Sequence, residues 1–232
     1  MPPPSTEGPS LGHPVFLLNL KVYPNQLGLA AVRMAKLLEV LGKEMGVATA
    51  IAPTLPDLAR VADSVAIPVV AQHVDPGDAG ARTGYVPVET IEAAGARGSL
   101  VNHSEHPMAI ADIEDAVRRL LARNLVAVVC AADVPRARRL AETHPQYLAV
   151  EPPELIGGDR AVSTSRPEVV SGTVSAVRSV SSGTRVLCGA GVHDRHDVAR
   201  ALELGADGVL VASAVTRAPD AERAIRELLS GY

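Results

Sequence analysis

Aromatic side chains are scarce in this sequence: its 232 residues include no tryptophan, one phenylalanine and four tyrosines. Because 47% of the residues are hydrophobic and only 21% are charged, the chain can still bury a sizeable core, which excludes disorder of the whole chain. That core must be filled by Val, Leu, Ile and Ala. These residues fill parallel strands that are covered on both faces, so the composition favours an α/β protein.

Cysteine is equally rare. The two cysteines, Cys130 and Cys188, are too few for a disulfide framework. Each lies inside an apolar, strand-like run, and we interpret both as small buried hydrophobic residues rather than as catalytic thiols. This use of cysteine is typical of a reducing compartment.

Excess positive charge, long apolar runs and a secretion signal are also missing. The net charge of −4 gives no general attraction to phosphate backbones, so nucleic acid is a poor candidate partner. No apolar run approaches the length of about 18 residues that predicts a membrane span. The segment Met1–Pro14 lacks the basic start and apolar stretch of a signal peptide, and its Pro, Gly and Ser content predicts a flexible leader. We therefore expect a cytoplasmic protein.

Short apolar runs alternate with amphipathic segments along the rest of the chain. The runs predict eight strands, at Val15–Leu20, Val47–Ala52, Val69–Val74, Gly98–His103, Val126–Ala131, Tyr147–Glu151, Arg185–Ala190 and Gly208–Ser213. The segments between and after them predict helices at Leu27–Gly46, Thr54–Ala66, Pro87–Ala96, Pro107–Asn124, Pro135–His144, Arg166–Ser181, Asp194–Gly205 and Pro219–Gly231.

Eight βα units in one uninterrupted pattern predict a parallel sheet with right-handed crossovers. Eight is the number of strands that closes a (β/α)₈ barrel, so residues 15–232 are expected to form one such domain. A doubly wound open sheet is the alternative. That fold usually carries a glycine-rich turn after its first strand, whereas this chain has Asn-Leu-Lys-Val-Tyr-Pro at residues 19–24.

Polar residues at the predicted strand ends are the candidates for catalysis, because barrel active sites form at the carboxyl ends of the strands. Asn19 and Lys21 lie two residues apart and hence on one side of the first strand. His103 ends the fourth run and is a candidate acid, base or electrophile, although a structural histidine is also consistent with the pattern. Glu151 ends the sixth run. The loop after it, Pro152–Asp159, has prolines at its start and glycines near its end, as expected of a hinged lid.

Small residues follow the seventh and eighth runs. Gly191 lies in Cys-Gly-Ala-Gly-Val, and Ala212 and Ser213 end the last run, just before a predicted short helix at Ser213–Arg217. Loops after strands seven and eight typically bind phosphate in such barrels. The H-x-x-H spacings of residues 103–106 and 193–196 have no third ligand nearby, so we expect no metal site.

Taken together, these residues resemble the triosephosphate isomerases, in their short archaeal-type form. The matching stretches are NLK (Asn19–Lys21), VNHSEH (Val101–His106), VEPPELIG (Val150–Gly157), CGAGV (Cys188–Val192) and GADGVLVAS (Gly205–Ser213). They follow the family's order and span nearly the whole chain after the leader.

The resemblance implies interconversion of dihydroxyacetone phosphate and glyceraldehyde 3-phosphate through an enediolate, without cofactor or metal. It implies that Glu151 is the base, that His103 polarises the carbonyl and that Lys21 balances the substrate's charge. A helix starting at Pro107 would keep His103 neutral. The remaining residues that the resemblance places around the substrate or its phosphate are Asn19, Ile156, Gly191, Ala212 and Ser213.

The resemblance also implies a homo-oligomer, with a tetramer favoured over a dimer. The family's usual Thr-Gly after Ile156-Gly157 is replaced here by Gly158-Asp159, which places the kinetics of the lid in question. Two other functions stay open on the sequence alone. One is a different phosphate-binding barrel, such as a sugar-phosphate isomerase of histidine or tryptophan biosynthesis, and the other is a non-catalytic barrel that only binds a sugar phosphate.

Overall fold

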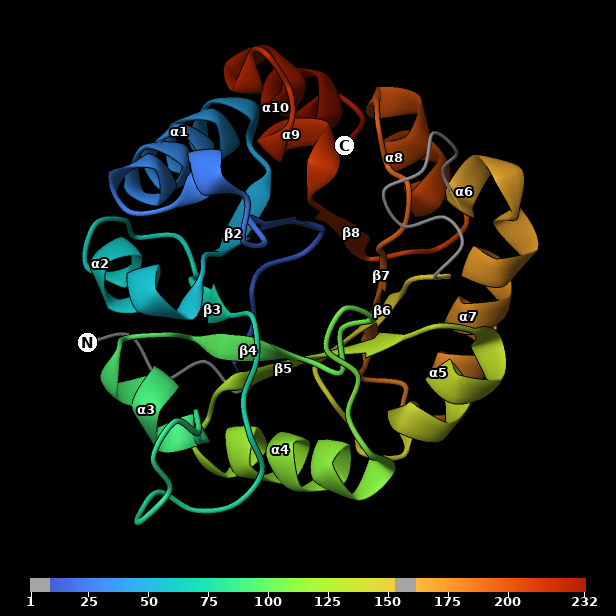
Figure 1. Ribbon diagram of the computed structural model, residues 1–232. Helices are drawn as coiled ribbons and strands as arrows, with labels where there is room; N and C mark the ends of the chain where they lie inside the picture. Colours follow the sequence, from blue (N-terminus) through green and yellow to red (C-terminus); the bar gives the residue numbers. More distant parts are fainter. Residues whose placement is uncertain (1–8, 153–161) are drawn as a thin grey trace, which may run out of the picture.

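The computed structural model describes residues 9–152 and 162–232, and within these residues eight parallel strands form one sheet. The strands are β1 (Val15–Asn19), β2 (Ala48–Ala52), β3 (Val70–Ala71), β4 (Gly98–Val101), β5 (Val126–Ala131), β6 (Tyr147–Val150), β7 (Arg185–Cys188) and β8 (Gly208–Val211). Their order is β2-β1-β8-β7-β6-β5-β4-β3. A parallel bridge between Ile51 and Val69 joins the two ends of this order, so the sheet closes on itself (Figure 1). The predicted (β/α)₈ barrel is confirmed.

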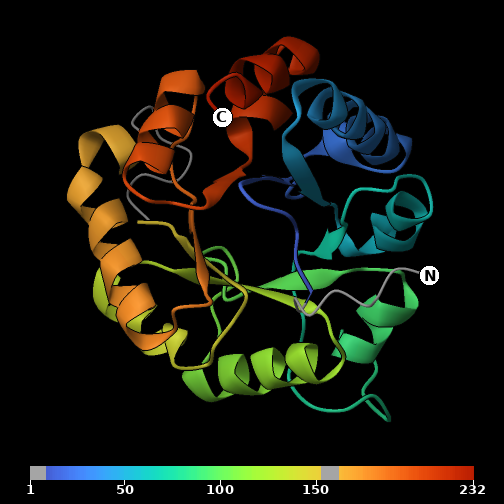
Figure 2. The ribbon, with the colours of Figure 1, turned by 180° about the vertical axis from the view of Figure 1, so that it is seen from behind.

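Helices surround the barrel on all sides, as both axial views show (Figures 1 and 2). In the described ranges they are α1 (Leu29–Met45), α2 (Leu58–Ala62), α3 (Val88–Ala93), α4 (Ile110–Ala122), α5 (Val134–Ala141), α6 (Val162–Ser165), α7 (Pro167–Val180), α8 (Arg195–Glu203), α9 (Ser213–Thr216) and α10 (Ala221–Leu229). Short 3₁₀ turns at Pro24–Gln26 and Leu55–Asp57 precede α1 and α2. The predicted short helix after the eighth strand is present as α9. None of the described helices is long and apolar enough to cross a bilayer.

Most predicted elements extend a few residues beyond those of the structure, and two of these differences are informative. The apolar run predicts a third strand over Val69–Val74, whereas β3 ends at Ala71. Val74 is buried without being in a strand, because the backbone N–H of Asp75 donates to the carbonyl of Val86 and closes a loop instead. The apolar run therefore indicates burial there and not strand pairing. The other difference, in the segment before α4, affects the active site and is described below.

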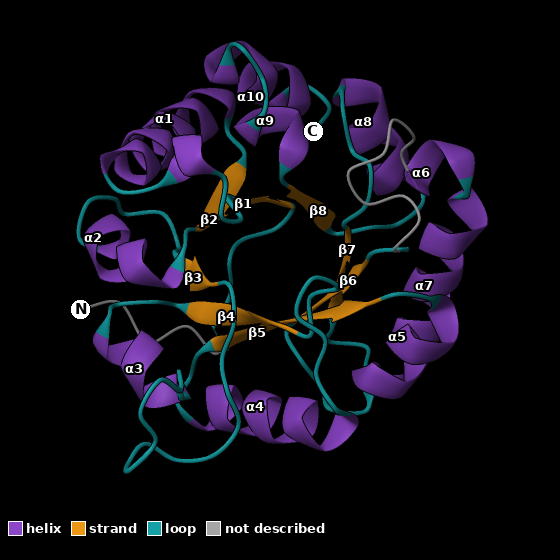
Figure 3. Cartoon of the chain, in the orientation of Figure 1, coloured by secondary structure: helices purple, strands orange, loops and turns teal. Residues whose placement is uncertain are grey.

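Side chains along β1 alternate between the barrel interior and the surrounding helices. Val15 and Leu17 belong to the inner hydrophobic cluster, whereas Phe16 and Leu18 belong to the cluster between strands and helices. All four are fully buried. The same alternation directs Asn19 inward at the carboxyl end of the strand. Figure 3 shows the strands in orange inside the ring of helices, with teal loops joining the two layers. The strand pattern thus determines which residues reach the barrel mouth.

The amino-terminal segment is tied to the opposite end of the barrel. Leu11 is 2% exposed and belongs to the inner cluster. The Tyr147 hydroxyl accepts a hydrogen bond from the Leu11 N–H (3.1 Å) and donates one to the carbonyl of Gly12 (2.8 Å). Arg185 donates to the hydroxyls of Ser10 (2.6 Å) and Tyr147 (3.0 Å). The described part of the predicted leader, residues 9–14, therefore contributes a side chain to the core.

Replacing Leu11 with Ala is expected to lower the free energy of unfolding by about 2–4 kcal/mol, because it leaves a cavity at the end of the inner core. Equilibrium urea unfolding would measure the loss. The matched control is Leu29→Ala, the same change at a side chain that is 65% exposed, which should alter stability by no more than about 0.5 kcal/mol. Equal losses in the two variants would show that Leu11 does not belong to the stable core.

Candidate active site

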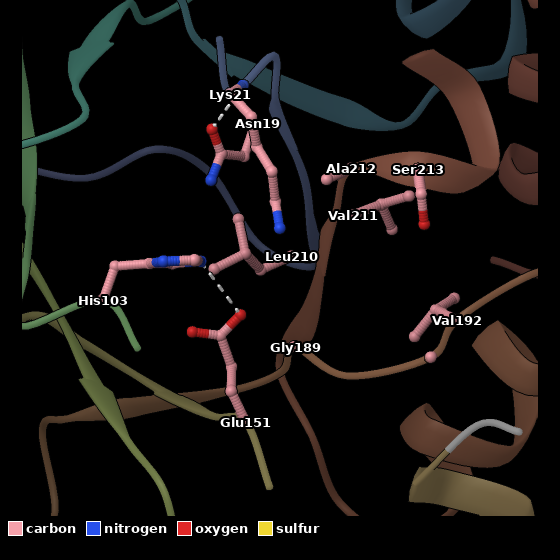
Figure 4. A pocket seen from close by; sticks show the side chains of 11 residues that line it. Asn19, Lys21, His103, Glu151, Gly189, Val192, Leu210, Val211, Ala212 and Ser213 are labelled. Atoms are coloured by element: carbon pink, nitrogen blue, oxygen red, sulfur yellow. Dashed lines mark hydrogen bonds and ion pairs between the residues drawn. The ribbon is translucent and has the colours of Figure 1, made fainter. Parts of the chain in front are cut away.

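A pocket lies at the carboxyl ends of the strands (Figure 4). It encloses about 400 Å³ of free space, part of it open to solvent. Seven of the residues singled out in the sequence line it together: Asn19, Lys21, His103, Glu151, Gly191, Ala212 and Ser213. The eighth, Ile156, and the rest of the predicted lid beyond Pro152 lie outside the described residues. The four lining residues that were not singled out are Gly189, Val192, Leu210 and Val211.

Glu151 follows β6 and is held at the floor of this pocket. Its backbone N–H donates to the carbonyl of Ala131 (2.8 Å), which continues the pairing of β6 with β5. The residue is 3% exposed, and its Oε1 lies 3.6 Å from Nε2 of His103. Burial raises the pKa of Glu151, and the neighbouring His103, Cys130 and Lys21 only partly oppose this effect. A carboxyl whose pKa is raised by burial is a stronger base once it is ionised.

His103 reaches the pocket from the loop that follows β4. The preceding residue, Asn102, has a positive φ of 60° and fastens the loop through bonds to the carbonyl of Cys130 and the N–H of Met108. Nδ1 of His103 accepts a hydrogen bond from the N–H of Glu105 at 3.2 Å. A nitrogen that accepts carries no proton, so this contact assigns the neutral tautomer with its proton on Nε2, the atom that faces the pocket.

The sequence predicted that a helix starting at Pro107 would keep His103 neutral, and this prediction is wrong. The helix expected to start at Pro107 starts at Ile110, after a turn closed by the His106 N–H and the carbonyl of His103. The Met108 N–H donates to Asn102 Oδ1, and the first carbonyl that accepts from α4 is that of Ala109, so residues 107–109 belong to the loop. The turn brings the N–H of Glu105 to the imidazole, and the first turn of α4 is not involved.

Lys21 has a backbone conformation that is rare for residues other than glycine, with φ at 49°. Two side chains hold it there: Asn19 Oδ1 accepts from the Lys21 N–H (2.9 Å), and Gln72 Nε2 donates to the Lys21 carbonyl (3.0 Å). The ammonium group forms an ion pair with Glu105 at 2.6 Å. Strained backbone of this kind concentrates at functional sites, where neighbouring groups keep a side chain in a set position.

Sequence reasoning did not assign a role to Gln72 or to Glu105. Gln72 lies inside the predicted third run, Val69–Val74, and only the end of β3 at Ala71 shows that it stands at a strand end, where the rule for the other polar residues applies. Glu105 lies in the VNHSEH stretch, but its sequence position does not show that its side chain turns back to Lys21. The hydrogen bond from Gln72 and the ion pair with Glu105 each link Lys21 to a loop that is far from it in the chain.

The opposite side of the pocket is formed by small residues from the loops after β7 and β8. Gly191 has a φ of 66°, which only glycine adopts without strain, and Ala212 is the residue that caps α9. Ser213 is the first residue of that helix. The first N–H groups of a helix have no partner within it, and small side chains allow an anion to approach them. This side of the pocket can therefore hold a phosphate group.

Gly189 determines how much room Glu151 has. A Cβ atom at this position would lie 2.5 Å from Cγ and 3.0 Å from Cδ of Glu151. We expect Gly189→Ala to displace the carboxylate and to lower kcat by about 10²-fold, since small displacements of reacting groups have effects of this size. Steady-state kinetics would measure the change. The control is Gly183→Ala, where the added methyl group meets nothing within 4 Å and kcat should be unaltered. An unaltered kcat in Gly189→Ala would mean that Glu151 has no fixed position.

Both cysteines are buried, as the sequence predicts. Burial raises the pKa of Cys188 to about 12 and that of Cys130 well above its usual value. A thiol that keeps its proton is a poor nucleophile, so neither cysteine has the environment of a catalytic thiolate. The reactive groups of the pocket are the carboxylate, the imidazole and the ammonium group.

Comparison with known proteins identifies relatives over most of the chain. Residues 14–228 match the family model described as triosephosphate isomerase. The triosephosphate isomerase of Methanothermus fervidus is 46% identical over 220 residues, which cover 95% of this chain and 99% of the relative. That of Caldivirga maquilingensis is 46% identical, covering 93% and 96%, and that of Methanosarcina acetivorans is 43% identical, covering 94% and 99%.

Proposed function

The chain belongs to the triosephosphate isomerase family, and from this premise we propose that Glu151, His103 and Lys21 carry its reaction. The protein is an enzyme that interconverts dihydroxyacetone phosphate and D-glyceraldehyde 3-phosphate, as this family does in glycolysis and gluconeogenesis. The family match removes the two alternatives left open by the sequence, a different sugar-phosphate isomerase and a non-catalytic binder. The observation that best supports the residue roles is the contact between a buried carboxylate and a neutral imidazole in one pocket.

Glu151 is the base in this proposal. Its carboxylate removes a proton from the carbon next to the carbonyl group and returns a proton to the neighbouring carbon, so that one side chain serves both half-reactions. Burial raises its pKa and so strengthens it as a base. Its position next to Gly189 directs the carboxylate toward the cavity, where the substrate carbons would lie.

His103 stabilises the charge that develops on the substrate oxygen. With its proton on Nε2, the ring donates a hydrogen bond into the pocket, where the carbonyl oxygen becomes the enediolate oxygen. Lys21 adds a positive charge on the same side, and its Nζ is held 2.6 Å from Glu105. Asn19 lines the pocket and helps to position the substrate, and its Oδ1 also accepts the hydrogen bond from the Lys21 N–H.

The phosphate group is held by Gly191, Ala212 and Ser213, with Ile156 of the loop after β6 as a further contact. Ala212 and Ser213 lie on the side of the pocket away from His103 (Figure 4), and Gly191 lines the same pocket. An enediolate phosphate loses its phosphate readily in water, so the loop that follows Glu151 would have to cover the intermediate. No cofactor or metal enters this mechanism.

We also propose that the enzyme acts in the cytoplasm as a homo-oligomer, a tetramer in preference to a dimer. Light scattering after size-exclusion chromatography would test the oligomeric state.

The pH dependence of kcat/KM tests the role of Glu151. The base acts only when it is ionised, and its pKa is raised, so we expect kcat/KM to fall on acidification at a pH above the ordinary glutamate value. The substrate phosphate also titrates, near about pH 6. The control is therefore the affinity for glycerol 3-phosphate, which carries the same phosphate group but no acidic C–H bond. If kcat/KM falls only in parallel with this affinity, the titration of Glu151 does not govern the reaction.

A further inference from the structure

The catalytic carboxylate borders a second pocket besides the one that holds the substrate. Glu151 lines this pocket together with Asn102, Ser104, Ala132 and Arg136. Its other lining residues come from the ends of β4 and β5 and the segments that follow them, whereas the phosphate-binding residues line the first pocket. Glu151 therefore stands in the wall between two spaces and borders both of them.

The two carboxylate oxygens have different surroundings. Oε1 faces Nε2 of His103 in the substrate pocket. Oε2 is buried and has no hydrogen bond of ordinary geometry among the described residues, although the thiol of Cys130, a weak donor that lines the same pocket, lies close enough to lower the pKa of the carboxyl. Figure 4 shows it pointing away from Val192 and Ser213, on the side opposite the phosphate-binding residues. A buried carboxylate oxygen costs free energy unless it is well hydrogen-bonded, and a thiol is only a weak donor, so this atom has room for a stronger donor than the described part of the protein supplies.

Water is the donor that fits the second pocket. The centres of water molecules can occupy about 170 Å³ of it, more than the roughly 10–15 Å³ that a single water needs. Ser104 and Arg136 on its rim are exposed, and they connect the space to solvent. Cys130, Ala131 and Ala132 also line it, and none of these three has a long side chain to fill the space beside the carboxylate.

We propose that this second pocket, named here the rear pocket, is the route by which the proton taken up by Glu151 exchanges with solvent. The inference rests on the proposed role of Glu151 as the base. After the first proton transfer the side chain is a neutral carboxylic acid, and half a turn about its last C–C bond moves the O–H from the substrate side to the rear pocket. There the proton passes to water while a second water proton returns to the carboxyl, so no charge or atom is gained or lost.

A substrate-side cover would not stop this exchange, because the rear pocket reaches the carboxyl from behind. The hydrogen delivered to the product would then come from one of two sources, the substrate or the solvent. A proton that stays on the carboxyl is returned to the neighbouring carbon, and a proton that exchanges is replaced by one from solvent. Filling the rear pocket should change this division without changing the rate at which carbon–hydrogen bonds are broken.

The test is isomerisation of glyceraldehyde 3-phosphate in D₂O, with ¹H NMR measuring the fraction of product that carries deuterium at C1. Ala132→Leu adds a branched, bulky side chain to the rear pocket, and Ala132 does not line the substrate pocket. We expect the deuterated fraction to fall by about twofold or more, as water is displaced from the pocket. The value of kcat/KM should stay within about twofold of the wild type, since the acid–base groups are unaltered.

The matched control is Ala122→Leu, the same change on the exposed face of α4. If Ala132→Leu does not fold, as judged by its circular dichroism, the smaller Ala132→Val serves in its place. An unchanged or increased deuterated fraction in the folded variant would overturn the proposal, as would an equal fall in the control or a wild type that incorporates no deuterium. A wild type that does not isomerise at all would instead overturn the proposed roles of the site.

Discussion

Replacing Glu151 with Gln is expected to lower kcat by about 10³–10⁴-fold, the upper part of the range for removing a general base. The amide has nearly the shape of the carboxylate but cannot accept the proton from carbon. Binding should survive, because the phosphate group is held on the other side of the pocket. A coupled assay gives kcat, and titration with glycerol 3-phosphate gives the affinity. A variant that keeps more than about one tenth of wild-type kcat would rule out Glu151 as the base.

The same variant is expected to be more stable than the wild type at neutral pH. Because the pKa of Glu151 is raised in the folded protein, its ionised form costs free energy on folding. This cost is absent below the ordinary glutamate pKa and appears as the pH rises through the raised value. The neutral amide of the variant carries no such cost, so its melting temperature should exceed that of the wild type at pH 7, and the difference should narrow on acidification. A variant with a lower melting temperature than the wild type at pH 7 would show that neighbouring groups offset the cost of burying the ionised carboxylate.

Replacing Lys21 with Met is expected to lower kcat/KM by about 10²–10³-fold, equivalent to about 3–4 kcal/mol of binding in the transition state. The ammonium group is the positive charge placed in the pocket beside the imidazole, and its side chain is 13% exposed, so solvent screens it little. Most of the loss should appear as a higher KM, because the charge attracts the substrate as well as the enediolate.

Lys36→Met is the matched control for this substitution. Lys36 is exposed on α1, so the same loss of charge should leave kcat/KM within about twofold of the wild type. Comparable losses in both variants would mean that the net charge of the protein, and not the position of Lys21, attracts the substrate. A normal kcat/KM in Lys21→Met would remove Lys21 from the proposed site.

Most of the architecture could be predicted from local sequence patterns. Burial along β1 follows the two-residue period, so Val15, Leu17 and Asn19 point inward as a strand requires. The bounds of elements differed where burial did not coincide with regular structure. Val74 is buried in a loop, and the segment from Pro107 to Ala109 precedes its helix, because the chain there satisfies its backbone groups through turns.

By itself, the sequence determined that the chain forms eight βα units, which family it belongs to, and which polar residues stand at strand ends. These are properties of periodicity and of short motifs, which can be recognised from a few consecutive residues without knowing what packs against them in the fold. Only the tertiary structure decided the contacts between loops: the hydrogen bond from Gln72 to Lys21, the ion pair of Lys21 with Glu105, and the close approach of Gly189 to Glu151. Such contacts depend on how barrel closure arranges strand ends that are remote in sequence, so local patterns carry no information about them. The environment of Glu151 is likewise a result of closure, because its burial between two pockets both raises its pKa and places its carboxylate between the substrate and rear sides.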